Sequence, residues 1–141
     1  MLKQVVVVAL WLGPVVSLSS LRAAPAAQPA LRCLHGSLEV PAQEMRRNQA
    51  LRMARQINLA EGGGSLPSQP RRFRPLEQLL NIPPAPAGFR VQFYTDGSTY
   101  TFCLKDTADP CRYAIFSDQD KSIYEANASP GGVHIVPAEI P

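Results

Sequence analysis

Four aspartates are the residues of this chain whose types and spacing come nearest to a metal site. Asp118 and Asp120 flank a predicted turn, and Asp106 and Asp109 lie between two cysteines. Their carboxylate oxygens could converge on Ca²⁺, which is bound by oxygen ligands. No glycine-punctuated ligand pattern accompanies them, and turn aspartates commonly accept bonds from nearby backbone amides. We therefore predict turn-forming aspartates and no metal or other cofactor.

Histidine and serine give little support for catalysis. His35 and His134 lie at opposite ends of the mature chain, without a partner at metal-ligand spacing. Ser98 follows Asp96-Gly97, a pair typical of a hairpin turn, and lacks the G-x-S-x-G elbow of a hydrolase nucleophile. The sequence predicts a non-enzymatic protein, with a hydrolase that uses Ser98 and His134 as a distant alternative.

Three cysteines indicate a disulfide. Cys103 is placed at the end of one predicted strand and Cys111 at the start of the next, so this pair is predicted to close a short C-terminal disulfide loop. Cys33 is then left over. It could pair between molecules or be a buried thiol, and we favour the buried thiol.

Residues 1–26 have the three parts of an export signal. Lys3 precedes an apolar core, and residues 24–26 supply a small-residue exit. Gly13 and Pro14 interrupt the core, which is shorter than a membrane-spanning helix needs. We predict cleavage after residue 26, a periplasmic or extracellular protein, and no membrane span in the mature chain. An uncleaved anchor is the alternative.

The charge of the mature chain argues against nucleic acid as a partner. The whole sequence has 14 basic and 11 acidic residues, and removal of Lys3 and Arg22 with the leader leaves 12 basic and 11 acidic residues. A near-neutral exported protein lacks the basic surface that binds phosphate backbones. A protein partner is the class that remains, and the oligomeric state cannot be read from the sequence.

One α+β domain is predicted over residues 41–141, after an extended lead-in over residues 27–40. Strong helix formers fill residues 42–61, with a proline before them and three glycines after them. Small and medium apolar residues repeat at intervals of three and four, which predicts one narrow apolar stripe and a solvated arginine-bearing face. The stripe consists of Ala50, Met53, Ala54, Ile57 and Ala60.

Alternating apolar residues predict a sheet after this helix. Runs over 89–94, 99–105 and 111–116 are separated by turn residues, and a fourth run over 121–125 can return along the third. A short helix over 75–80 precedes them, and 134–136 could add an edge strand. The predicted fold class is α+β, with one amphipathic helix packed on a three- to four-stranded antiparallel β-meander that carries the disulfide loop.

The loop over residues 66–75 is a candidate binding surface. It is rich in proline and arginine and shows no periodicity, which predicts a loop that crosses the surface. Arg71, Arg72 and Arg74 are its predicted partner-binding residues, and they suit an acidic partner. This loop supports the alternative function, a stand-alone secreted binding module or inhibitor.

Two short motifs and the order of the elements resemble a known family. NQALRMARQINLAE at 48–61 and YAIFSDQDKSIYEA at 113–126 are similar to the helix and the late strand-turn-strand of the globular part of type IV pilins and type II secretion pseudopilins. The basic leader, the peptidase site and the long apolar stalk helix of filament-forming members are not found in this sequence. The resemblance implies an exported bacterial protein with a structural or interaction role in secretion or surface assembly.

Overall fold

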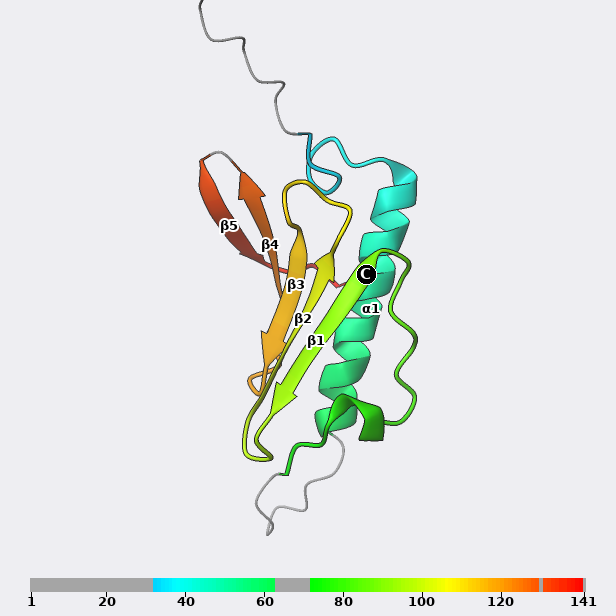
Figure 1. Ribbon diagram of the computed structural model, residues 1–141, viewed down its shortest axis with the longest axis vertical. Helices are drawn as coiled ribbons and strands as arrows, with labels where there is room; N and C mark the ends of the chain where they lie inside the picture. Colours follow the sequence, from blue (N-terminus) through cyan, green and yellow to red (C-terminus); the bar gives the residue numbers. More distant parts are fainter. Residues whose placement is uncertain (1–31, 63–71, 130, 141) are drawn as a thin grey trace, which may run out of the picture.

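The protein folds as one helix alongside a meandering sheet (Figure 1). The computed structural model describes residues 32–62, 72–129 and 131–140. In this part of the chain the elements are, in order, α1 (Pro41–Gly62), the short 3₁₀ helix η1 (Leu76–Gln78), β1 (Phe89–Thr95), β2 (Tyr100–Asp106), β3 (Ala114–Asp118), β4 (Tyr124–Ser129) and β5 (Gly132–Pro137). The α+β class is confirmed, and the sheet has five strands in place of the three or four predicted.

The strands follow one another in the sheet as they do in the sequence. Their order is β1-β2-β3-β4-β5, and each neighbouring pair is antiparallel. A tight turn at Asp96-Gly97 joins β1 to β2, and Gly97 has φ +85°, a value that glycine adopts without steric cost. The Asp96 carboxylate accepts bonds from the Ser98 and Thr99 amides, chiefly the latter, and these bonds lower its pKa to about 2.

The helix covers one face of the sheet with its apolar stripe. Pro41 begins α1 and Gly62 ends it, as the sequence predicts. Ala50, Ala54 and Ile57 of the predicted stripe are fully buried, and Met53 nearly so. Opposite them lie the inward-facing residues of β2 and β3, because side chains alternate between the two faces of a strand. The sheet side of this core includes Phe89 of β1, Tyr100, Phe102 and Leu104 of β2 and Ile115 of β3, together with Tyr113 and Ile123, which directly precede β3 and β4.

A buried amide fixes the turn between β3 and β4 to the helix. The Asn58 side-chain nitrogen donates to the Ser117 hydroxyl at 2.9 Å and to the Lys121 carbonyl at 3.1 Å, while Tyr100 donates its hydroxyl proton to the Asn58 oxygen at 2.8 Å. Lys121 has φ +63°, in the left-handed region that costs energy for a residue with a Cβ. The bond from Asn58 therefore holds a strained backbone in place.

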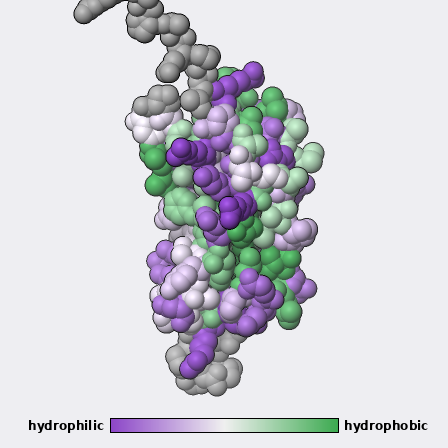
Figure 2. Space-filling model, in the orientation of Figure 1, coloured by the Kyte–Doolittle hydropathy of each residue, from purple (hydrophilic) through white to green (hydrophobic). Residues whose placement is uncertain are grey.

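The last strand is the edge of the sheet, as predicted. Among the described residues β5 pairs with β4 and with no other strand, and all six of its residues are exposed. Figure 2 shows apolar residues at the left flank of the molecule, where β5 lies in the same orientation. None of the helices in the described ranges combines the length and the apolar character that a membrane span requires.

Candidate functional site

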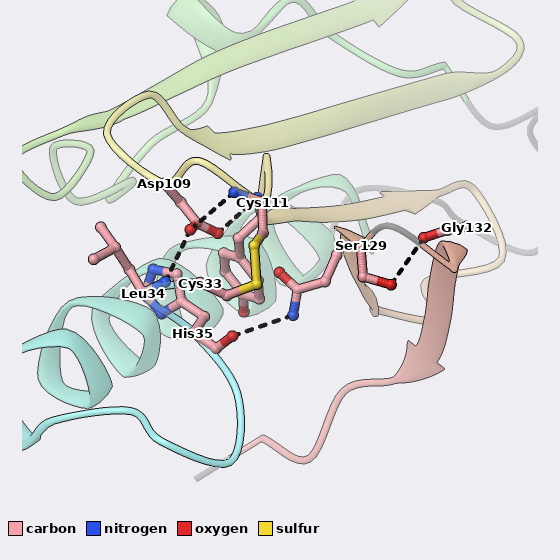
Figure 3. The surroundings of a disulfide bond; sticks show 9 residues. Cys33, Leu34, His35, Asp109, Cys111, Ser129 and Gly132 are labelled. Carbon is pink, nitrogen blue, oxygen red and sulfur yellow. Dashed lines mark hydrogen bonds between the residues drawn. A yellow bond between two sulfur atoms is a disulfide. The ribbon is translucent and has the colours of Figure 1, made fainter. Parts of the chain in front are cut away.

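The disulfide joins Cys33 to Cys111, so the predicted pairing of Cys103 with Cys111 is wrong. The Cα atoms of Cys33 and Cys111 are 5.1 Å apart, and Cys103 is a free thiol. Figure 3 shows the bond beneath the turn that leads into β3, with the segment of Leu34 and His35 beside it. The bond attaches the described part of the lead-in, residues 32–40, to the sheet.

The alternation of β2 explains why Cys103 does not pair. Phe102 and Leu104 face the core, so Cys103, between them, faces the other side of the sheet. Cys111 is buried in the turn before β3, on the side that the 32–40 segment covers. Two cysteines on opposite faces of a sheet cannot form a bond without moving the backbone.

Asp109 organises the same corner. One carboxylate oxygen accepts the Leu34 amide at 2.9 Å and the Cys111 amide at 3.2 Å, and the other accepts the Tyr113 amide at 3.0 Å (Figure 3). Asp109 therefore accepts backbone amides, as turn aspartates commonly do. These three bonds fix the path of the chain on both sides of the disulfide.

A buried histidine lies next to the disulfide. His35 is 1% exposed, its Nδ1 is 2.6 Å from Glu39 Oε1, and its Nε2 is 2.9 Å from Asp106 Oδ2. Each ring nitrogen lies within hydrogen-bond distance of a carboxylate oxygen, and a ring nitrogen that carries a proton donates to that oxygen. The ring also packs on Tyr113, with centroids 4.2 Å apart. His35 therefore has a structural role in this corner of the fold, which its position in the sequence does not predict.

Two arginines of α1 complete this cluster. Arg46 Nη2 lies 3.0 Å from Asp106 Oδ2, and Arg47 bridges Glu39 at 3.0 Å and Glu125 at 3.3 Å. The sequence predicts a solvated arginine-bearing face for this helix, whereas Arg46 and Arg47 lie against carboxylates from the lead-in and the sheet. We call this set of residues the clamp cluster: His35, Glu39, Arg46, Arg47, Asp106, Tyr113 and Glu125.

The pKa values in the clamp cluster follow from burial and pairing. Burial disfavours the ionised form of Asp106, but bonds from His35 and the Ala108 amide and the charge of Arg46 outweigh it and lower the pKa of this carboxyl. Burial raises the pKa of Tyr113 strongly, and its bond to the Glu125 carboxylate raises it further. Tyr113 is therefore a hydrogen-bond donor and a poor source of protons for chemistry.

A cleft of about 340 Å³ opens beside the clamp cluster. His35, Glu39, Arg47 and Glu125 line it, and each of these ionisable side chains is bound to another member of the cluster. His134 of β5 also lines the cleft, outside the cluster. Groups satisfied in this way rigidify a structure, while a catalytic nucleophile needs a base that is free to act on it. The arrangement is suited to holding the 32–40 segment on the sheet.

The sequence contains only a faint signal for the clamp cluster. His35 and Glu39 are four residues apart, and His35 follows Cys33 by two. This spacing alone predicts no contact, because the partner Asp106 is 71 residues later in the chain and lies beside His35 only in the folded protein. The cluster arises from contacts between distant segments, which periodicity and motif spacing do not reveal.

The remaining predicted acidic and catalytic residues are engaged locally. Asp118 accepts the Asp120 amide at 2.9 Å, as a turn residue does. Within the described ranges, no group of three or more His, Cys, Asp or Glu side chains is arranged to hold a metal ion. Ser98 donates its hydroxyl proton to Asp96 at 2.8 Å in the β1–β2 turn, whereas His134 lies in β5, so the pair is not brought together.

The predicted partner-binding arginines differ in their placement. Arg71 lies outside the described residues, and Arg72 is exposed. Arg74 is tied to the end of α1, because its amide lies 3.1 Å from Glu61 Oε1 and its guanidinium donates to the Ala60 carbonyl at 3.1 Å. Burial raises the pKa of Glu61, although the Arg74 amide and charge oppose that effect. Arg74 therefore has a structural role in closing the helix end.

The free thiol of Cys103 should react slowly. It is partly buried between strands, and burial raises its pKa, while the nearby charge of Lys105 only partly opposes this effect. We expect the folded protein to present one titratable thiol that reacts with a disulfide reagent at pH 8 more slowly than glutathione does.

Digestion without reductant should yield one linked peptide pair containing Cys33 and Cys111. A pair containing Cys103 would contradict this assignment.

These features define a class of protein: a disulfide-bonded α+β domain in which one helix covers a five-stranded antiparallel meander. No family model, curated protein or solved structure matched the chain when each was compared with it. The functional conclusion therefore rests on the residues and the geometry of the chain itself.

Proposed function

We propose that this chain is an exported, non-enzymatic, pilin-like protein that acts by contacting other protein chains in secretion or surface assembly. One helix laid along a sheet of consecutive antiparallel strands is compatible with the resemblance of residues 48–61 and 113–126 to pilin-like domains. A disulfide supports export, because such bonds persist in oxidising compartments.

The observation that carries this proposal is the free edge of β5. Edge strands present unpaired backbone N–H and C=O groups, and proteins usually protect them with charged residues or a covering segment. β5 has the sequence GVHIVP, without a charged side chain except when His134 is protonated. Val133, Ile135 and Val136 are each more than half exposed. Such an edge suits the addition of a strand from another chain, in which backbone bonds give affinity and apolar side chains give specificity.

The clamp cluster supports a role without catalysis. Its carboxylates, arginines and histidine are bound to one another and hold the lead-in on the domain. The described lead-in, residues 32–40, is thereby fixed to the domain. The alternative function, partner binding by the loop at 66–75, receives less support, because the Arg74 guanidinium donates to the Ala60 carbonyl at the end of the helix.

The proposal can be tested by photo-crosslinking in the native host. The full-length chain would carry p-benzoylphenylalanine in place of Ile135, and a matched variant would carry it in place of Tyr94, an exposed aromatic residue on β1 at the opposite edge of the sheet. We expect exported, disulfide-bonded protein and protein adducts from position 135 only. Cytoplasmic retention of the chain would contradict the export proposal, and equal or absent adducts at the two positions would contradict a role for the β5 edge.

A further inference from the structure

A second cleft, of about 400 Å³, lies at the other end of the helix, away from the clamp cluster. It is bounded by the last turns of α1, the segment that leads into β4 and the segment that follows β5. Its volume is within the range of small-molecule sites, which is about 300–1,000 Å³. Its lining residues are Arg55, Asn58, Leu59, Gly62, Lys121, Ile123 and Ile140.

The floor of this cleft is apolar. Ile123 is buried at its base, while Leu59 is 56% exposed and Ile140 is 40% exposed. The Ala138 amide donates to the Ile123 carbonyl at 2.9 Å, which holds the segment of Ile140 beside the end of the helix. A ligand that covers Leu59 and Ile140 would remove apolar surface from water, which contributes about 25 cal/mol per Å².

Two cations stand in the same cleft. Arg55 and Lys121 have no carboxylate within ion-pair distance among residues 32–62, 72–129 and 131–140. In the clamp cluster, by contrast, both arginines are paired with carboxylates. A positive charge beside the end of a helix is favoured by the helix carbonyls, which accounts for Lys121 but not for Arg55 in the preceding turns. The lining of this cleft therefore contains two cations and no carboxylate among the described residues.

The backbone of Lys121 is held next to the end of the helix, and its side chain reaches the last residue of α1. The strained conformation of Lys121 is held by its own amide, which donates to Asp118 at 2.9 Å, and by the bond from the buried Asn58 to its carbonyl. Its ammonium lies against Gly62, where an added Cβ would be only 2.4 Å from Nζ.

We propose that this cleft binds a carboxylate that is attached directly to an apolar group. The apolar part covers Leu59, Ile123 and Ile140, and the carboxylate lies between Arg55 and Lys121. A medium-chain fatty acid and the C-terminal residue of an apolar peptide share this chemistry. The site is separate from the β5 edge, so it can stand or fall independently of the assembly role.

Decanoate is the probe for this site, with decanol as the uncharged comparison. Titration of the ¹⁵N-labelled oxidised protein should shift the amide signals of Leu59, Lys121 and Ile123, and decanol should bind about tenfold more weakly or worse. Acetyl-leucine serves as the peptide arm. Tighter binding of decanoate assigns the site to a fatty acid, and tighter binding of acetyl-leucine assigns it to a peptide terminus.

Charge-neutralising variants make the test decisive. Arg55→Gln combined with Lys121→Gln should weaken decanoate binding about tenfold or more. Arg52→Gln removes a charge from the same helix outside the cleft and should leave binding unchanged. Leu59→Asn should weaken binding through the apolar floor, while Leu80→Asn, at an exposed leucine elsewhere, should not. Binding that tolerates loss of both cations, or shifts confined to other surfaces, would overturn the proposal, as would the absence of binding at millimolar decanoate.

Discussion

Cys33→Ala should lower the free energy of unfolding by roughly 4 kcal/mol, the largest effect that we expect from any single substitution. The disulfide joins residues 78 positions apart, so it closes a loop that contains the helix and the first two strands. In the chain-entropy model a closure of this length removes roughly 4 kcal/mol of conformational freedom from the unfolded chain. Guanidinium chloride unfolding of oxidised protein, followed by far-ultraviolet circular dichroism, measures the change.

Cys103→Ala is the matched control for this experiment. It removes a partly buried thiol that is not part of the disulfide, and we expect a loss of no more than about 1 kcal/mol. A loss as large as that of Cys33→Ala would restore Cys103 as a bonded residue and contradict the pairing of Cys33 with Cys111. Cys33→Ala should also speed hydrogen exchange at residues 32–40, because the bond holds this segment on the sheet.

Local patterns predicted most of the fold. The spacing of Ala50, Met53, Ala54 and Ile57 predicted the buried stripe of α1, and Pro41 and the glycines after residue 61 predicted its ends. Alternation in the runs at 89–94 and 99–105 predicted the first hairpin, with Asp96-Gly97 as its turn. These features depend on residues that are close in sequence, because the periodicity of side chains along a helix or strand and the geometry of a tight turn are local properties of the backbone.

Long-range contacts were the features that the sequence did not reveal. Proximity in sequence favoured Cys103 as the partner of Cys111, but the faces of β2 decide the pairing, and Cys103 is on the face away from Cys33. His35 carried no recognisable motif, because its two carboxylate partners meet only after the lead-in has folded back on the sheet. Arg46 and Arg47 were indistinguishable from surface arginines for the same reason. The candidate site was therefore less predictable than the fold.

His35→Ala should destabilise the protein by about 3 kcal/mol at neutral pH. The substitution removes a ring that packs on Tyr113 and leaves one buried carboxylate, Asp106, and one partly buried carboxylate, Glu39, with one fewer partner each. Loss of a hydrogen-bond partner from a buried acceptor typically costs about 1–3 kcal/mol and more for a charged group, and the lost packing of the ring adds to this cost, while Arg46 and Arg47 still bond to the two carboxylates. His134→Ala, at an exposed histidine, should change the unfolding free energy by less than about 0.5 kcal/mol.

The same substitution should change how stability depends on pH in acid. Burial disfavours ionised Asp106, but its contacts, those with His35 first among them, lower its pKa in the folded state below the unfolded value. A depressed carboxyl pKa contributes stability that is present above the unfolded pKa, about 4, and is lost as pH falls through the folded pKa. The wild-type unfolding free energy should therefore decrease below about pH 4, and the decrease should be shallower in His35→Ala because the folded pKa of Asp106 then lies nearer its unfolded value. Unfolding curves between pH 7 and pH 2 measure both slopes. Parallel pH profiles for the two proteins would mean that His35 does not stabilise the Asp106 carboxylate. The contribution of His35 to stability would then come from the packing of its ring alone.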